Sequence, residues 1–142
     1  SNNIGSIMRS CILFNCKSVI VSKDNAPDIN SSIAKAASGA LEVINYIKVT
    51  NLSHTIRKFK KNNFWVCGLD INNSNLNNNF DIPQKCLLVL GAESKGLRKL
   101  TKKECDSIIS IPMIPNPMFQ IDSLNVSNAC SIALYEHFKK YN

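Results

Sequence analysis

The sequence has 142 residues, 44% of them hydrophobic, and a formal net charge of +7 at pH 7. This length allows one compact domain with its own core and is too short for two comfortable ones. No apolar run approaches the roughly 18 residues that a membrane span needs, which excludes an integral membrane protein. The first residues, SNNIGSIMRS, lack the basic start and apolar middle of a secretory signal peptide, although a targeting segment could have preceded Ser1.

The cysteine pattern predicts free thiols. The six cysteines form no C-x-x-C pair and mostly lie in apolar stretches, and the chain has only two histidines. Zinc would need clustered ligands, so we expect no metal and no disulfide framework. The protein is therefore predicted to reside in a reducing compartment, cytoplasmic or organellar (mitochondrion or plastid), and not to be secreted.

Short apolar runs alternate with helical patterns along the chain. The runs at 17–22, 43–50, 64–70, 86–92 and 107–112 are nearly continuously apolar, which is typical of strands covered on both faces in a parallel sheet. Helices are predicted at 6–16, 31–41, 51–63 and 97–106. This alternation predicts an α/β fold with a mainly parallel sheet flanked by helices.

Two segments in the second half of the chain are predicted to be a loop and a last helix. The Asn-rich stretch 71–80 offers almost nothing to bury and is predicted to be a loop. A last helix follows, for which Asp122 or Ser123 is the expected N-cap. Its apolar stripe contains Ala129 and Ala133, whose small side chains allow close packing against either a sheet or a second subunit.

Three polar segments are placed where a parallel sheet binds ligands, at the loops beyond strand carboxyl ends: 2–9, 91–96 and 122–127. Each also has a purely structural interpretation. The segment GAESKG has neither Walker nor G-x-G-x-x-G spacing, so its glycines suit an ordinary turn as well as a ligand loop.

Basic residues are clustered in three places. They are Arg57, Lys58, Lys60 and Lys61; Lys95, Arg98, Lys99, Lys102 and Lys103; and Lys139 and Lys140. The clusters suit either a solvated helix face or a polyanionic partner such as RNA.

Together, the three polar segments carry a family resemblance. NNIGSIMRS, with Asn3 and Arg9 six positions apart, LLVLGAESKGLR, and ISIPM followed by SLNVSNA occur in the order of three family motifs. The chain resembles, over almost its whole length, the SpoU (TrmH-like) family of RNA ribose 2′-O-methyltransferases in the knotted SPOUT superfamily. SSIAKAASGALE and GLRKLTKKECDSIISIPM are most similar to the bacterial enzymes that methylate a guanosine ribose in large-subunit rRNA.

The resemblance implies a C-terminal trefoil knot, a homodimer, and S-adenosylmethionine (SAM) as methyl donor. It implies transfer of the methyl group to a ribose 2′-hydroxyl of RNA, with rRNA expected over tRNA. The implied cofactor-binding residues are Gly91, Ile111, Met113 and Leu124. The implied catalytic residues are Asn3, Arg9, Glu93, Ser123 and Asn125, with Arg9 binding the target phosphate and stabilising the developing oxyanion.

Two features depart from the family. The segment 114–122 is longer than its family counterpart, and the chain begins almost at the first motif. Residues 1–142 are therefore expected to form a single catalytic domain without the usual first strand or an N-terminal RNA-binding domain. Two alternatives stay open: a knotted RNA-binding or ribosome-assembly module without catalysis, and a nucleotide-binding α/β protein. The sequence leaves open the target nucleotide and the group that removes the hydroxyl proton.

Overall fold

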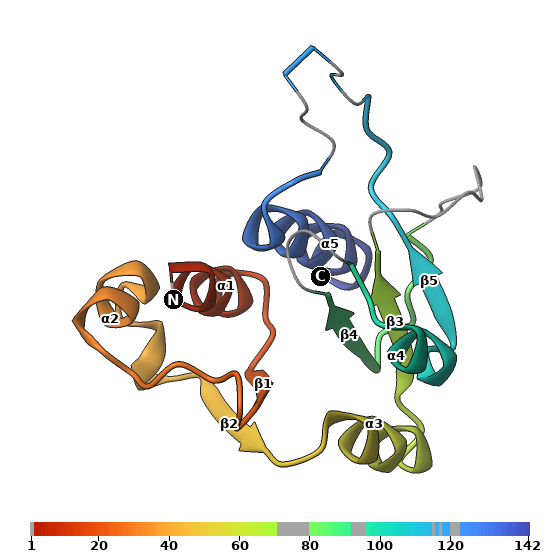
Figure 1. Cartoon of the computed structure of the whole chain (residues 1–142), viewed down its shortest axis with the longest axis horizontal. Coiled ribbons are helices and arrows are strands. Elements are labelled where there is room, and N and C mark those ends of the chain that lie inside the picture. Colours follow the sequence, from red (N-terminus) through yellow and green to blue (C-terminus); the bar gives the residue numbers. More distant parts are fainter. Residues whose placement is uncertain (1, 71–79, 92–95, 115, 117, 120–122) are drawn as a thin grey trace.

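The computed structural model describes residues 2–70, 80–91, 96–114, 116, 118–119 and 123–142. Its elements follow one another along the chain (Figure 1). They are α1 (Asn2–Leu13), β1 (Ser18–Ser22), α2 (Ser31–Ala37), the 3-10 helix η1 (Ala40–Glu42), β2 (Asn45–Val49), α3 (Leu52–Lys61), β3 (Trp65–Leu69), β4 (Cys86–Leu90), α4 (Lys99–Glu104), β5 (Ser107–Ile109) and α5 (Val126–Tyr141).

Every strand pair in the described part of the chain is parallel, and these strands form two sheets. β1 pairs with β2, in register from Ser18 opposite Asn45. β3 is the centre of the second sheet and pairs with β4 on one side and β5 on the other, with Cys67 opposite both Leu88 and Ser107. The predicted α/β class with parallel strands and flanking helices is confirmed, whereas the strands form two sheets instead of one.

The starts of the first and last helices differ from expectation. α1 already begins at Asn2, so the segment 2–9 is helical and not a loop. α5 begins at Val126, and its N-cap is Asn125 instead of Asp122 or Ser123. The Asn125 side-chain oxygen accepts a hydrogen bond from the Ser127 N–H at 2.9 Å, which satisfies one of the free donors of the first turn.

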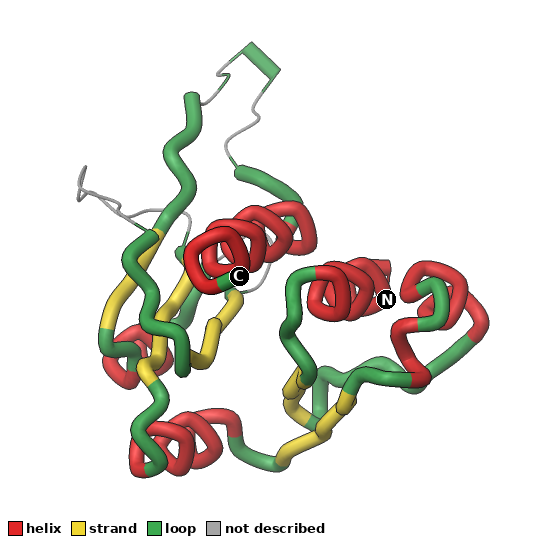
Figure 2. The backbone as a smooth tube through the Cα atoms, turned by 180° about the vertical axis from the view of Figure 1, so that it is seen from behind, coloured by secondary structure: helices red, strands yellow, loops and turns green. Residues whose placement is uncertain are grey.

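Two apolar clusters form the core, and α5 contributes to both. Cys130 and Leu134 pack with Met8 and Cys11 of α1, while Ala133 packs against β3 and β5. Leu88 and Leu90 of β4 border both clusters. Figures 1 and 2 show α1 lying between α2 and α5 from both sides. Ala133 is 1% exposed, so the small-residue stripe packs on the sheet within one chain.

Helices α1 and α5 run parallel. Ser10 Oγ lies 2.6 Å from Ser131 Oγ, and further along both helices the Phe14 ring packs on the Tyr135 ring, with centroids 5.7 Å apart. On the other side of α1, a Cβ on Gly5 would stand 2.6 Å from the Ala36 Cβ, so only glycine permits this closeness to α2. α1 is thereby fixed between two helices. Within the described ranges, no helix has both the length and the apolar content to cross a bilayer.

Candidate functional site

A pocket opens at the carboxyl ends of β3 and β4, the edge at which parallel sheets bind ligands. The pocket is small and partly open to solvent. Most of its walls are apolar side chains and glycine backbone. The lining residues are Leu69, Asp70, Leu90, Gly91, Gly96, Ile111, Met113, Leu124, Val126 and Ala129.

Two glycines form a narrow part of the pocket wall because their backbones nearly touch. A Cβ on Gly91 would lie 2.2 Å from the Gly96 carbonyl carbon and 2.4 Å from its oxygen. Gly96 itself has φ +65°, a left-handed conformation that most other residues adopt only with strain. The wall therefore needs glycine at both positions. Gly91 is required for space, and Gly96 is required for space and for its left-handed backbone conformation.

The sequence analysis missed Asp70, a carboxylate in this pocket. Asp70 follows β3 directly and is 7% exposed. Its Oδ1 accepts a hydrogen bond from the Leu97 N–H at 3.4 Å, and the Lys102 Nζ lies 2.6 Å from its Oδ2. The available signal was its position at the end of a strand. Its partner Lys102 is distant in sequence and lies on another element, so the pairing could not be read from spacing.

All four residues predicted to bind a cofactor line this one pocket: Gly91, Ile111, Met113 and Leu124. They come from three separate segments, namely the end of β4, the segment after β5, and the residues before α5. Glu93, predicted to be catalytic, lies outside the described residues. The structure thus brings the predicted cofactor set together, while its binding role stays a prediction.

The predicted catalytic residues Ser123 and Asn125 flank Leu124 at the start of α5. Asn125 is exposed, and its Oδ1 is held by Ser127, which donates both its N–H at 2.9 Å and its Oγ–H at 2.5 Å. The Ser131 hydroxyl in turn donates to the Ser127 carbonyl at 2.9 Å and contacts Ser10 of α1. Hydrogen bonds therefore extend from α1 to the edge of the pocket.

The first family motif, NNIGSIMRS, lies on α1 beside this end of α5. Its two predicted catalytic residues lie on different faces of that helix. Asn3 precedes Ser10 by about two helical turns and so shares its face toward α5. Because the helices are parallel, Asn3 is level with the start of α5. Arg9 lies about 120° around α1 from Asn3, is exposed, and does not line the pocket. One chain therefore does not bring Arg9 into the pocket.

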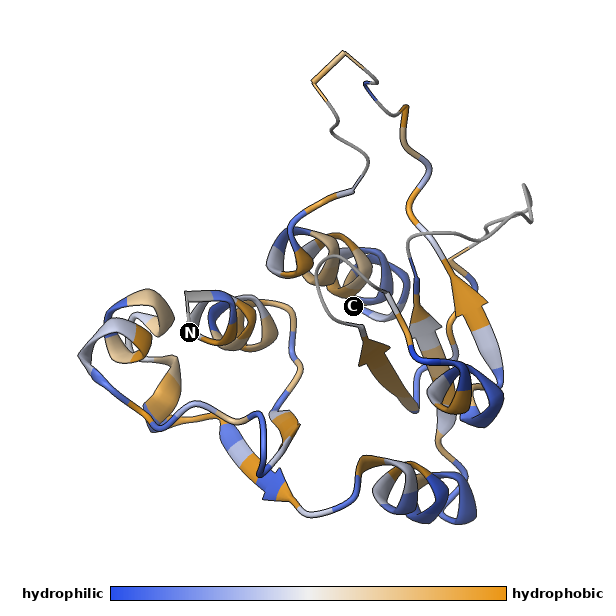
Figure 3. Cartoon of the chain, viewed as in Figure 1, coloured by the Kyte–Doolittle hydropathy of each residue, from blue (hydrophilic) through white to orange (hydrophobic). Residues whose placement is uncertain are grey.

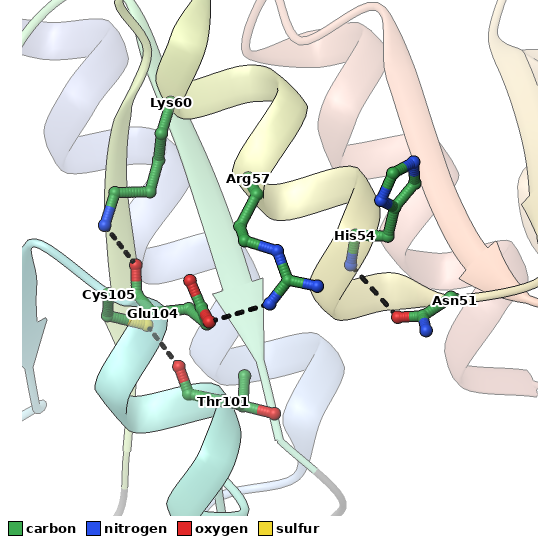
Figure 4. A network of polar contacts seen from close by, with 7 residues as sticks. All are labelled: Asn51, His54, Arg57, Lys60, Thr101, Glu104 and Cys105. Carbon is green, nitrogen blue, oxygen red and sulfur yellow. Dashed lines mark hydrogen bonds and ion pairs between the residues drawn. The ribbon is translucent and has the colours of Figure 1, made fainter.

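Helices α3 and α4 lie side by side and carry most of the basic clusters (Figures 3 and 4). Arg57 forms an ion pair with Glu104 at 3.1 Å, and Lys60 donates to the Glu104 carbonyl at 3.1 Å. The other cations of this α3–α4 surface form no ion pair with any residue in the described ranges; they are Lys58, Lys61, Arg98, Lys99 and Lys103. Lys95 lies outside the described residues.

All six cysteines are free, as predicted. Burial raises the pKa of the Cys130 thiol to about 12. A hydrogen bond from the buried Cys11 thiol lowers the pKa of half-buried Cys16 to about 6; it outweighs burial, which raises this pKa, and a backbone hydrogen bond with Ser18 lowers it further. Among the described side chains, no group of three or more His, Cys, Asp or Glu is arranged to hold a metal ion.

The fold and the pocket define an α/β protein with a ligand site at the carboxyl ends of parallel strands. The chain belongs to the SpoU rRNA methylase family, whose model matches residues 1–135. A protein of Staphylococcus aureus (strain COL), named for the TrmH family of tRNA/rRNA methyltransferases, is 37% identical over 139 residues, which cover 98% of this chain and 54% of that protein.

Two further relatives carry specific names. The 23S rRNA (guanosine-2′-O-)-methyltransferase RlmB of Coxiella burnetii is 39% identical over 135 residues, which cover 95% of this chain and 52% of that protein. A crystal structure of the SpoU methyltransferase AviRb from Streptomyces viridochromogenes superposes with a TM-score of 0.81 at 26% identity, covering 98% of this chain and 55% of that one. Another AviRb structure, with a TM-score of 0.79 at 24% identity, is a complex with the cofactor AdoMet and has the same coverage. The chain spans about half the length of the curated relatives it matches.

Proposed function

We propose that this chain transfers a methyl group from SAM to a ribose 2′-hydroxyl of RNA, most specifically a guanosine of large-subunit rRNA. The observation that carries the proposal is the convergence of Gly91, Ile111, Met113 and Leu124 on one pocket at the carboxyl ends of β3 and β4. Membership of the SpoU family, the AdoMet complex of AviRb and the name of the Coxiella burnetii relative support it.

The chemistry of the pocket lining suits SAM. Its apolar lining suits a flat adenine ring and the carbon atoms next to the sulfonium, and the glycine backbones leave room for a ligand at the wall. Gly91, Ile111 and Leu124 would hold the donor through their backbones, with Met113 at the rim. When bound, SAM supplies an activated methyl group on a positively charged sulfur, which becomes a neutral thioether after transfer.

The residues at the start of α5 and on α1 would serve the RNA side. Transfer needs the 2′-oxygen in line with the methyl group and removal of the hydroxyl proton. Asn125, held by Ser127 beside the pocket, would orient the ribose together with Ser123 and Asn3. Arg9 would bind the target phosphate and stabilise the developing oxyanion, because its guanidinium matches phosphate geometry.

The α3–α4 surface would bind RNA phosphates. Those of its cations that form no ion pair within the described ranges would contact phosphates, which gain affinity through counterion release. We prefer rRNA to tRNA on the name of the Coxiella burnetii relative, and the Staphylococcus aureus relative is named for both.

A homodimer, a C-terminal trefoil knot and a reducing compartment, cytoplasmic or organellar, are further parts of the proposal. Exposed Leu13, Ile132 and Tyr135 on α1 and α5 offer an apolar contact surface for a second copy, in place of the buried alanine stripe. The superposition with AviRb supports the knot, and the six free thiols support the compartment. That residues 1–142 form a single catalytic domain stays a prediction.

Calorimetric titration with SAM, followed by transfer of labelled methyl groups to rRNA fragments, tests the proposed activity. The expected result is saturable SAM binding and a product ribose that resists alkaline cleavage at one guanosine. RNA binding without SAM binding would instead favour a non-catalytic RNA-binding module. A shift of the melting temperature by nucleotides and not by SAM would favour a nucleotide-binding protein.

A further inference from the structure

Asp70 is the only charged side chain among the described residues that line the pocket. Seven of the other nine are apolar side chains and two are glycines, so this carboxylate stands out from the rest of the described lining. Its side chain is 5% exposed, whereas that of Lys102 is 42% exposed. A charge buried to this degree is retained only when it is paired and hydrogen-bonded. Its partners therefore indicate what the carboxylate does.

Among the described residues, Asp70 contacts the backbone of the pocket wall and a lysine on α4. Oδ1 accepts the Leu97 N–H, and a Cβ on Gly96 would stand 2.2 Å from this same oxygen. Gly96 in turn is pressed against Gly91, the residue that closes β4. The carboxylate thus holds Gly96 and Leu97 from one side while Gly91 limits them from the other.

Lys102 fixes the carboxylate from α4. Its Nζ lies 2.6 Å from Oδ2, an oxygen that is itself fully buried. This contact is an ion pair, and its Coulomb attraction draws the carboxylate toward α4. A continuous series of contacts therefore joins α4, Asp70, the Gly96–Leu97 backbone and Gly91.

We propose that Asp70 is a positioning residue of the donor pocket, which holds the Gly96–Leu97 backbone in the conformation that admits SAM and is itself oriented by Lys102. The inference rests on the proposed function, since it concerns the same pocket. It assigns no contact of Asp70 with the reacting atoms. Loss of the carboxylate leaves the Gly96–Leu97 backbone unrestrained on the Asp70 side, so that SAM must order this wall on binding and binds more weakly.

Four substitutions separate the charge from the hydrogen bond. Asp70→Asn keeps an acceptor for Leu97 and loses the ion pair, whereas Asp70→Ala loses both. Lys102→Met removes the cation and Lys102→Arg keeps it. The Kd for SAM is expected to rise roughly tenfold or more for Asp70→Ala, by about three- to tenfold for Asp70→Asn and Lys102→Met, and by less than about twofold for Lys102→Arg.

The matched control is Asp81→Asn. Asp81 also forms an ion pair with a lysine, Lys140, but its side chain is 81% exposed and it does not line the pocket. This variant is expected to keep the wild-type Kd for SAM. For the Asp70 and Lys102 variants, the KM for SAM should rise while kcat at saturating SAM stays within about threefold, because a wall residue acts on binding and not on the transfer step.

The measurements are SAM titration and steady-state methyl transfer, with a melting curve for each variant. A merely structural residue would lower the melting temperature and the active fraction without changing KM, and that result overturns the inference. Wild-type SAM affinity in Asp70→Ala, or equal affinities of Lys102→Met and Lys102→Arg, does so too. If Asp70→Ala fails to fold, the two variants of half-exposed Lys102 decide. Failure of the wild-type chain to bind SAM overturns the proposed function itself, and the inference with it.

Discussion

Substitution of Gly91 by alanine should close the donor pocket. The added Cβ would lie 2.2 Å from the Gly96 carbonyl carbon, 2.4 Å from its oxygen and 2.7 Å from the Leu97 nitrogen. Ordinary contacts of a Cβ begin at 3.4 Å, so the neighbouring backbone must recede by more than an ångström. All three atoms belong to the backbone and cannot rotate away as a side chain would.

The size of the effect follows from this crowding. Overpacking a well-packed site costs about 1–3 kcal/mol. The pocket is the nearest open space, so we expect the wall to move into it and relieve part of the strain. If reopening the pocket for SAM restores the full strain, the affinity falls by about 5- to 150-fold, since each 1.4 kcal/mol is roughly a factor of ten.

Calorimetric titration of Gly91→Ala with SAM measures this loss, and Gly39→Ala is the matched control. Gly39 has φ +88° and open space around its missing Cβ, so its substitution strains only the backbone and costs about 1–2 kcal/mol of stability. The control should therefore unfold more easily and bind SAM normally. Wild-type SAM affinity in Gly91→Ala would show that this wall does not belong to the donor site.

Three further results are expected. Arg9→Ala should bind SAM as the wild type does, because Arg9 does not line the pocket, while methyl transfer falls by about two to four powers of ten. Arg98→Gln combined with Lys99→Gln should lower RNA affinity and reduce the slope of log K against log salt by about 1.4, if both contact single-stranded phosphates. Alkylation of Cys16, whose pKa is lowered to about 6 by the hydrogen bond from Cys11, should be nearly constant above about pH 7 and decline below pH 6, because the thiolate is the reactive form.

Each of these three predictions has a control variant or a control residue. Arg9→Lys should restore little transfer, since an ammonium cannot reproduce the planar guanidinium; normal turnover in either Arg9 variant would remove it from the mechanism. Lys23→Gln with Lys35→Gln removes the same charge elsewhere and should leave the salt slope unchanged. Buried Cys130, with its pKa raised to about 12, should alkylate far more slowly. A Cys16 rate still rising toward pH 9 would contradict the lowered pKa.

The strands were predictable because their chemistry is local. Runs such as 64–70 and 86–92 are apolar on both faces, and the structure places β3 and β4 inside them. Pairing is not local, and apolar periodicity does not specify which strands are neighbours. The division into two sheets was therefore invisible in the sequence.

The helix starts were harder to predict because tertiary contacts decide them. Asn and Gly in NNIGS suggested a loop, yet Gly5 is helical and allows close packing on Ala36 of α2. Before α5, the residue types at Asp122, Ser123 and Asn125 all favour an N-cap. The cap is Asn125, whose side chain accepts a hydrogen bond from Ser127. Sequence preference alone does not choose among such candidates.

The candidate site was predictable only where motifs mark it. Gly91, Ile111, Met113 and Leu124 came from the family resemblance, and they converge on one pocket. Asp70 belongs to no quoted motif, and its significance depends on Lys102 lying 2.6 Å away on α4. Such a pair is recognisable only once β3 and α4 have been placed next to each other.

The packing of α1 on α5 also has a consequence for the order in which the chain can fold. The Ser10–Ser131 contact joins residues 121 positions apart, so α1 leaves the ribosome long before its partner helix exists. Until then the buried face of α1, including Met8 and Cys11, can pack only on α2 and the first strands. Contacts of such sequence separation close late and slow the folding rate. Although it precedes the other described helices, α1 is thus among the last of them to reach its final packing, and a chain cut before α5 would expose this face to aggregation.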